Sequence, residues 1–228
     1  MNRMKILLLI ALCSLFISNA QTEPVENNPA ARWEETIRTF EDWDKKNSFP
    51  PDAVLFVGSS SIRLWPTREC FGRFDVINRG FGGSQISDVV YFAERIVLPY
   101  KPKIIVFYAG DNDIAGGKTA KRVFEDYKKF IGLVQKQLPT TRIIFISIKP
   151  SGSRWSLWNV MKDANKMIED FSQKDDRLYY LDAATTLLDS NSQPNDELFL
   201  SDRLHLNDKG YQIWTKLLTP VIKQAMDQ

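Results

Sequence analysis

The stretch Val54-Leu55-Phe56-Val57-Gly58-Ser59-Ser60-Ser61-Ile62 decides how the rest of the chain is interpreted. Four apolar residues run into a glycine and three serines, a pattern typical of a short, buried parallel strand that ends in a turn. The residues after it, Ile62 to Trp65, favour the start of a helix. A serine in such a turn lies where helix-start amides face a developing negative charge. The turn therefore suits a nucleophilic hydroxyl, although the stretch taken alone fits a serine helix cap better.

Similar apolar segments recur along the chain and alternate with amphipathic segments. The predicted strands are 54–57, 74–78, 103–108, 142–147 and 177–181, and the predicted helices are 32–46, 86–98, a long one after Thr119, 154–172 and 208–226. The last helix is expected to be kinked or split at Pro220. This alternation predicts a three-layer α/β/α, flavodoxin-like fold with a five-stranded parallel sheet of order 2-1-3-4-5. Ligands of such sheets bind at the carboxyl ends of the strands, beside the first strand.

The first twenty residues have the features of a secretory signal peptide. Arg3 and Lys5 precede an apolar run, 6–17, and the small residue Ala20 ends the segment. About twelve apolar residues are too few to span a bilayer, although an uncleaved anchor is the alternative. We expect cleavage near Ala20-Gln21, a flexible lead-in at 21–31, a single domain at 32–228, and a secreted or periplasmic protein without a stable membrane anchor.

Charge, cysteine and histidine content exclude several classes of function. The net charge is +2, and removal of residues 1–20 takes away two basic residues and no acidic one, so no basic excess remains for nucleic acid. Cleavage leaves only Cys70, expected to be a small, buried or half-buried apolar group, and no internal disulfide. With His205 as the single histidine, no histidine-rich zinc site forms within one chain, and we predict neither a metal nor a cofactor.

The strand ends and the last loop carry the groups that acyl transfer needs. Besides the serines after the first strand, Gly82-Gly83 follows the second and Asn112 follows the third, while Asp202 and His205 precede the final helix. A histidine takes the proton of a nucleophilic serine, and a carboxylate orients the histidine. Backbone amides and an asparagine amide form an oxyanion hole. Each group alone also has a structural explanation, such as a turn cap for Asn112.

Taken together and in this order, the motifs resemble those of the SGNH hydrolases, also called GDSL-type esterases. The resemblance covers about residues 54 to 215 and extends to members similar to platelet-activating-factor acetylhydrolases and carbohydrate acetylesterases. Four sequence blocks carry it: Gly58-Ser59-Ser60, Gly80-Phe81-Gly82-Gly83, Gly110-Asp111-Asn112-Asp113 and Asp202-Arg203-Leu204-His205.

The resemblance implies a role for each matching residue. Ser60 is the expected nucleophile, His205 the base and Asp202 its orienting carboxylate, with the oxyanion held by the amides of Ser60, Gly83 and Asn112. The family usually has Asp before the nucleophile, where this chain has Ser59. Because three serines are adjacent, Ser61 is the second candidate for the nucleophile.

Residues after the fourth strand are expected to border the site. Trp155 and Arg154 are candidate substrate-binding residues, although Trp155 and Trp158 also fit a core or rim position. Gly116-Gly117-Lys118-Thr119 is similar to a phosphate-binding loop, but position 112 is Asn where that motif needs Gly.

The expected function is hydrolysis of a small acyl ester, an O-acetyl group on a carbohydrate, outside the cytoplasm. The substrate is a small molecule or a glycan ester, and the sequence does not indicate an oligomeric state. One alternative is a lysophospholipase or thioesterase-type acylhydrolase. The other is a non-catalytic carbohydrate-binding protein on the same fold, although binding alone would not require a base.

Overall fold

The computed structural model describes residues 29–228 of the chain. The predicted signal peptide and residues 21–28 of the predicted lead-in lie outside the described residues. Residues 29–31, the end of that lead-in, belong to a short 3-10 helix, η1 (Pro29–Trp33), in which Ala30 is buried. Regular structure therefore begins before the predicted domain start at residue 32.

Five parallel strands form one sheet in the order β2-β1-β3-β4-β5, which confirms the predicted topology. Their bounds are β1 Val54–Gly58, β2 Val76–Gly80, β3 Ile104–Tyr108, β4 Arg142–Ile146 and β5 Leu178–Leu181. Every residue of β1 and β3 is buried. Strands covered on both faces read as continuous apolar runs, which is why the sequence indicated them clearly.

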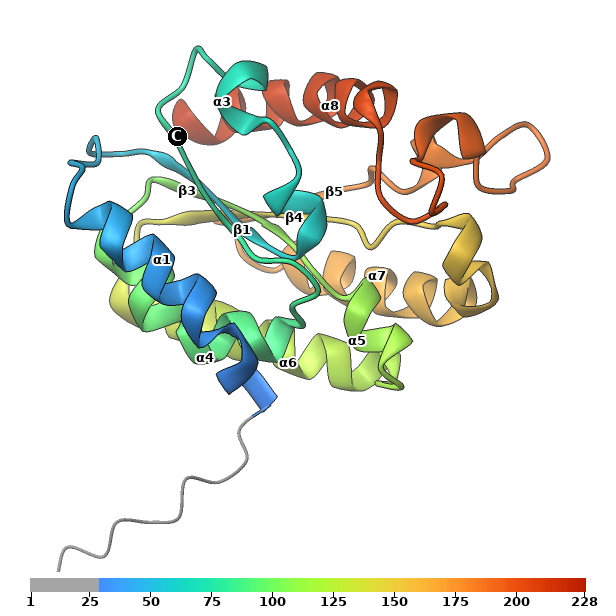
Figure 1. The fold of residues 1–228 in the computed structure, drawn as a ribbon, viewed down its shortest axis with the longest axis horizontal. Coiled ribbons are helices and arrows are strands. Elements are labelled where there is room, and N and C mark those ends of the chain that lie inside the picture. Colours follow the sequence, from blue (N-terminus) through green and yellow to red (C-terminus); the bar gives the residue numbers. More distant parts are fainter. Residues whose placement is uncertain (1–28) are drawn as a thin grey trace, which may run out of the picture.

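Helices cover both faces of the sheet, as Figure 1 shows. One face carries α1 (Glu34–Asp44), α4 (Ile86–Ile96), α6 (Ala120–Gln137) and α7 (Trp158–Ser172). The other carries α3 (Thr67–Cys70) and α8 (Asp208–Met226). Alternate strand residues serve the two cores, so Leu55 packs in the first and Phe56 in the second. Cys70 is half-buried at the edge of the second core, as predicted.

The strand order places a switch point at the carboxyl ends of β1 and β3. The chain leaves β1 toward β2 on one side, and β3 lies on the other side of β1. Short helices begin directly after these strands: α2 (Ser60–Arg63) after β1 and α5 (Asp111–Ala115) after β3. Loops that separate at such a point leave a crevice above the strand ends, where a ligand binds.

Several predicted elements differ from the structure, most of them by one or two residues at an end. The second strand begins at Val76 and not at residue 74, because its parallel register pairs Val76 with Val54 and Gly80 with Gly58. The seventh helix starts at Trp158, after a 3-10 turn, η3 (Gly152–Leu157). Residues 185–201, for which neither a strand nor a helix was predicted, contain the short 3-10 helices η4 (Thr185–Leu187) and η5 (Asp196–Leu198).

The last helix, α8, is not split at Pro220, contrary to the prediction. It runs from Asp208 to Met226 with Pro220 inside. A proline removes one helical hydrogen bond and strains the preceding turn, at a cost of about 3 kcal/mol. Leu218 and Ile222, which flank the proline, are fully buried against the second core, and their packing holds the helix together. Within residues 29–228 no helix is long and apolar enough to cross a membrane.

Candidate active site

The turn between β1 and α2 brings Ser60 to the surface of the sheet edge. Gly58 has φ +141°, and a Cβ atom there would lie 1.9 Å from the carbonyl oxygen of Tyr108 on the neighbouring strand. Only glycine fits this turn, because a side chain would be both strained and in collision. The Ser59 amide donates to the same carbonyl at 3.0 Å, and the helix begins at Ser60.

Ser60, His205 and Asp202 form a continuous hydrogen-bonded line. The distance from Ser60 Oγ to His205 Nε2 is 3.0 Å, and His205 Nδ1 lies 2.6 Å from Asp202 Oδ2. A carboxylate only accepts hydrogen bonds, so the imidazole proton lies on Nδ1 and the Nε2 lone pair faces the serine hydroxyl. This arrangement lets His205 take the proton of Ser60.

Asp202 is held in its charged form. Partial burial opposes ionisation, but the hydrogen bond from the His205 ring and those from the backbone amides of His205 and Leu204 outweigh it and lower the Asp202 pKa to about 2. The loop that carries Asp202 and His205 is closed by an antiparallel β-bridge between Phe199 and Leu206. Asp202 therefore orients the imidazole with a full negative charge at neutral pH.

Of the three adjacent serines, only Ser60 faces the histidine. Ser59 is fully buried, and Ser61, the second residue of α2, is 1% exposed. Neither lines the cleft that contains His205. The Ser59 carbonyl accepts hydrogen bonds from the amides of Ile62 and Arg63, so the position that usually carries Asp in the family serves here as a backbone anchor for α2.

Three donors converge on the cleft beside Ser60. The Ser60 amide opens α2, and the first amides of a helix have no partner within it. Gly83 has φ +75°, a conformation that favours glycine, and no described residue accepts a hydrogen bond from its amide. Ser60, Gly83 and Asn112 all line the same cleft. The structure thus brings the predicted oxyanion groups together.

Asn112 is held in one orientation by groups of fixed polarity. Its Nδ2 donates to the Ser84 carbonyl at 3.0 Å, and its Oδ1 accepts from Arg154 Nη2 at 3.0 Å. A carbonyl cannot donate and a guanidinium cannot accept, so the amide cannot be flipped. The second hydrogen of Nδ2 remains free for a ligand in the cleft.

A buried ion cluster supports this orientation. Asp111 accepts a hydrogen bond from Lys149 Nζ at 3.1 Å and forms an ion pair with Arg154, whose Nη1 lies 3.1 Å away, and Lys149 is 1% exposed. Burial opposes ionisation of Asp111, but the two cations outweigh it and lower its pKa. The carboxylate therefore stays charged and fixes Arg154 against Asn112.

Asp113, the last residue of the third block, connects two loops of the site. Its carboxylate accepts from the Ile86 amide at the start of α4 at 3.1 Å and from Lys118 Nζ at 2.8 Å. Lys118 also donates to Asp126 at 3.0 Å. The lysine of the segment that is similar to a phosphate-binding loop is thus occupied with ion pairs that fasten α5 and α6.

The cleft above the strand ends has a volume of about 560 Å³. Arg154, one of the two predicted substrate-binding residues, lines it, whereas Trp155 does not; that ring stacks on Trp158 at 6.2 Å and packs against the core. The prediction for Trp155 therefore has no support in the placement of its ring.

The sequence interpretation missed Trp33, Thr36 and Arg63, which also line the cleft. Trp33, which falls in the helix predicted at 32–46, lines the cleft and donates to Asp88 at 3.2 Å. A Cβ atom on Gly83 would lie 3.4 Å from its ring. Arg63, one helical turn after Ser60, also lines the cleft. The spacing of Arg63 from Ser60 was the one available signal, because residues three apart on a helix are neighbours.

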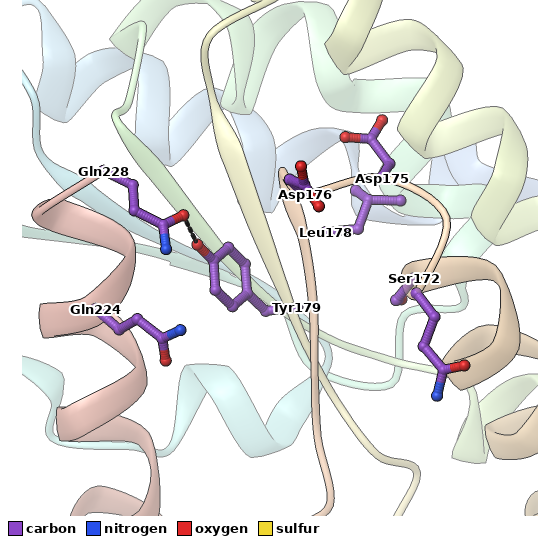
Figure 2. A pocket seen from close by; sticks show the side chains of 8 residues that line it. Ser172, Asp175, Asp176, Leu178, Tyr179, Gln224 and Gln228 are labelled. Atoms are coloured by element: carbon purple, nitrogen blue, oxygen red, sulfur yellow. Dashed lines mark hydrogen bonds between the residues drawn. The ribbon is translucent and has the colours of Figure 1, made fainter.

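A second hollow of about 500 Å³ lies at the opposite edge of the sheet, before β5 and beside the end of α8 (Figure 2). Its walls are polar: Tyr179 donates to Gln228 at 2.7 Å, and Ser172 donates to the Ile168 carbonyl. No histidine lies there, since His205 is the only one in the chain. The cleft at Ser60 is therefore the candidate active site.

A family model matches this arrangement over most of the chain. Residues 62–213 match the GDSL-like Lipase/Acylhydrolase family. The chain belongs to this family. Family membership makes it an ester-hydrolysing enzyme, as the resemblance implied. The matched segment includes Gly83, Asn112, Asp202 and His205 and begins two residues after Ser60.

Individual relatives agree with the family assignment. Platelet-activating factor acetylhydrolase IB subunit alpha1 of Bos taurus is 26% identical over 196 residues, which cover 81% of this chain and 80% of the relative. A Streptococcus pneumonia structure named for a platelet activating factor has a TM-score of 0.75 at 22% identity, covering 86% and 95% of the two chains. A carbohydrate esterase family 3 structure from Talaromyces cellulolyticus has a TM-score of 0.61 at 19% identity, covering 77% and 99%. At these identities the two structures show a shared fold.

Proposed function

We propose that this chain is an exported serine esterase that removes a small acyl group, above all an acetyl group, from a carbohydrate hydroxyl. The line from Ser60 through His205 to Asp202, with its distances of 3.0 and 2.6 Å, is the observation that carries this proposal. A nucleophile, a base and an orienting carboxylate at hydrogen-bond distance are what acyl transfer through a covalent intermediate requires.

The reaction proceeds in two halves. Ser60 Oγ attacks the ester carbonyl while its proton passes to His205 Nε2, and Asp202 stabilises the resulting imidazolium. The tetrahedral oxyanion is held by the amides of Ser60 and Gly83 and by Asn112 Nδ2. When the carbon–oxygen bond breaks, His205 gives the proton to the leaving alcohol. Water then attacks the acyl-serine by the same route, releasing the acid and restoring Ser60.

Two observations favour a small acyl group. The curated relatives are named acetylhydrolases. The ring of Trp33 stands against Gly83, so that even a methyl group on that glycine would touch it at 3.4 Å. A wall so close to the oxyanion donors leaves room for an acetyl group and disfavours a long acyl chain.

The alcohol portion is proposed to be a sugar. Polar side chains in the cleft, such as those of Thr36 and Asn112, and a fold shared with a carbohydrate esterase favour this choice, and the sugar then follows from fold-level analogy. The names of the curated relatives favour a second candidate, a lipid-derived ester.

Release of p-nitrophenol from esters of increasing chain length tests the proposal. The p-nitrophenyl acetate ester should be hydrolysed faster than the butyrate ester and far faster than the octanoate ester. Ser60→Ala should abolish all three activities. Acetate release from acetylated xylan then separates the sugar from the lipid candidate, for which acetylated lysophospholipid is the matching substrate. A protein that binds acetylated sugars and turns over none of these esters would be the non-catalytic alternative.

A further inference from the structure

The candidate cleft contains two arginines whose surroundings differ. Arg154 forms an ion pair with Asp111 at 3.1 Å and donates to Asn112 at 3.0 Å, so it has a carboxylate partner, which it shares with Lys149. Arg63 is exposed and lines the same cleft. Among the described residues no carboxylate forms an ion pair with Arg63, and no side-chain hydrogen bond involves its guanidinium. Arg63 therefore supplies an uncompensated positive charge to the cleft.

The backbone holds Arg63 beside the nucleophile. It ends the short helix α2 that Ser60 begins, and residues three apart on a helix lie on one face. Its amide donates to the Ser59 carbonyl at 3.1 Å. A Cβ atom on Gly80 would lie 2.4 Å from that same nitrogen, so α2 sits directly on the end of β2. The position of Arg63 relative to Ser60 is thus set by the fold.

The side chain of Arg63 occupies space that a glycine leaves open. A Cβ atom on Gly82 would lie 2.9 Å from Arg63 Nε and 3.4 Å from Nη2. The guanidinium therefore lies beside Gly82, the neighbour of Gly83, which is one of the oxyanion donors. A side chain at position 82 would force the Arg63 side chain to shift.

The remaining charges around the cleft do not offset Arg63. Within residues 29–228, no acidic residue lines the cleft. Asp202 is engaged by His205, and Asp111 is engaged by Lys149 and Arg154. A guanidinium presents a planar fork of donors that matches a carboxylate or a phosphate in two-pronged fashion.

We propose that Arg63 binds an anionic group, a carboxylate or a phosphate, on the alcohol portion of the ester substrate. This inference rests on the proposed function, because a small acyl group has no room for the charge and leaves it on the alcohol. The substrate class is then an acetyl ester of an acidic alcohol, such as an acetylated acidic sugar.

A charged ester and its neutral counterpart together isolate the effect of the substrate's negative charge. The ratio of kcat/KM for 4-acetoxybenzoate to that for its neutral methyl ester is measured for wild type, Arg63→Gln and Arg68→Gln. Arg68 is an exposed arginine of α3 that does not line the cleft, so its variant carries the same loss of net charge. The intrinsic reactivity of each ester is the same for every variant and cancels from the comparison.

Arg63→Gln should lower the ratio about fivefold or more, as expected for a charge-assisted contact in a half-open site. Arg68→Gln should leave it unchanged, and Arg63→Lys should give an intermediate value because it keeps the charge and loses the fork. High salt should lower the wild-type ratio toward that of Arg63→Gln. The same comparison with 4-acetoxyphenyl phosphate tells which anion is preferred.

A ratio that stays within twofold in Arg63→Gln for both anions would overturn the proposal. An equal fall in Arg68→Gln would reduce the effect to net charge, and a fall in Arg154→Gln alone would assign the anion to Arg154. If wild type hydrolyses the neutral esters and only the ratio fails, the esterase function stands. If it hydrolyses no ester at all, the proposed function itself is wrong.

Discussion

Replacing Asn112 by Ala is the most informative single change in the oxyanion hole. The free hydrogen of Asn112 Nδ2 faces the cleft, and it meets a negative oxygen only in the transition state. Loss of one such donor costs about 3 to 4 kcal/mol, which is roughly two to three orders of magnitude in kcat. Since the ground state does not use the contact, kcat and kcat/KM should fall together while KM changes little.

The same change also has a cost in stability that must be separated from the loss of rate. Asn112 makes two other hydrogen bonds, with the Ser84 carbonyl and with Arg154. Each contributes about 0.5 to 1.5 kcal/mol to the free energy of unfolding, so a loss of about 1 to 3 kcal/mol is expected. Rates are therefore measured well below the melting temperature of each variant and per folded molecule.

A matched control is available elsewhere in the core. Asn165 on α7 also makes two hydrogen bonds through its amide, with the backbone of Ile148 at 2.8 and 2.9 Å, and it does not line the cleft. Asn165→Ala should lower the melting temperature to a similar degree and keep kcat within about twofold. Asn112→Asp keeps an acceptor for Arg154 and should lose at least as much rate as Asn112→Ala. Unchanged kcat in Asn112→Ala, with only its melting temperature lowered, would remove Asn112 from the oxyanion hole.

Three further predictions concern the pH dependence of stability, the turn and the export of the protein. The Asp202 pKa is about 2 in the folded chain and about 4 when unfolded, so this depressed pKa stabilises the fold above pH 4 and the contribution disappears as pH falls toward 2. The Asp202 side chain is 46% exposed, so solvent screens this contribution. In denaturant titrations, the free energy of unfolding of wild type should exceed that of Asp202→Asn by at most about 1 kcal/mol at pH 7, and the difference should vanish near pH 2. A difference that persists at pH 2 would contradict the assignment. Gly58→Ala should lower the free energy of unfolding by at least about 3 kcal/mol, because its Cβ atom collides with the Tyr108 carbonyl. Gly132→Ala, in open space on α6, should raise it by up to about 1 kcal/mol. Similar unfolding midpoints for the two variants would refute the turn argument. Exported protein should begin at or near Gln21, and N-terminal sequencing that still finds Met1 would refute cleavage.

The fold was predictable because its central strands are buried on both faces. Apolar runs such as the one at 54–57 and 104–108 stand out in the sequence, and the helices between them dictate a parallel sheet. The start of β2 was not predictable, because Phe74 extends the apolar pattern and only pairing with β1 sets the register at Val76. Likewise, the proline in α8 predicted a break that packing against the sheet prevents.

The site was predictable where a residue type and its strand end suffice. Ser60 and His205 carry chemistry that few other residues supply, and their loops meet at one edge of the sheet. Trp33 was missed, because its place at the cleft depends on η1 and on a contact with Asp88, far away in the sequence. The orientation of Arg154 depends on Asp111, whose charge depends in turn on buried Lys149. No spacing pattern encodes such a chain of contacts.

The nucleophile is tested most directly by covalent labelling. Wild-type protein is treated with a fluorophosphonate, which modifies activated serines, and the modified peptide is sequenced by mass spectrometry. The label should lie on Ser60 alone, appear in step with the loss of p-nitrophenyl acetate hydrolysis, and be absent from Ser60→Ala and from His205→Ala. Ser61→Ala should still be labelled, because Ser61 is buried away from His205. Labelling of Ser61, or full hydrolysis by Ser60→Ala, would contradict the assignment of Ser60, His205 and Asp202 as the catalytic group.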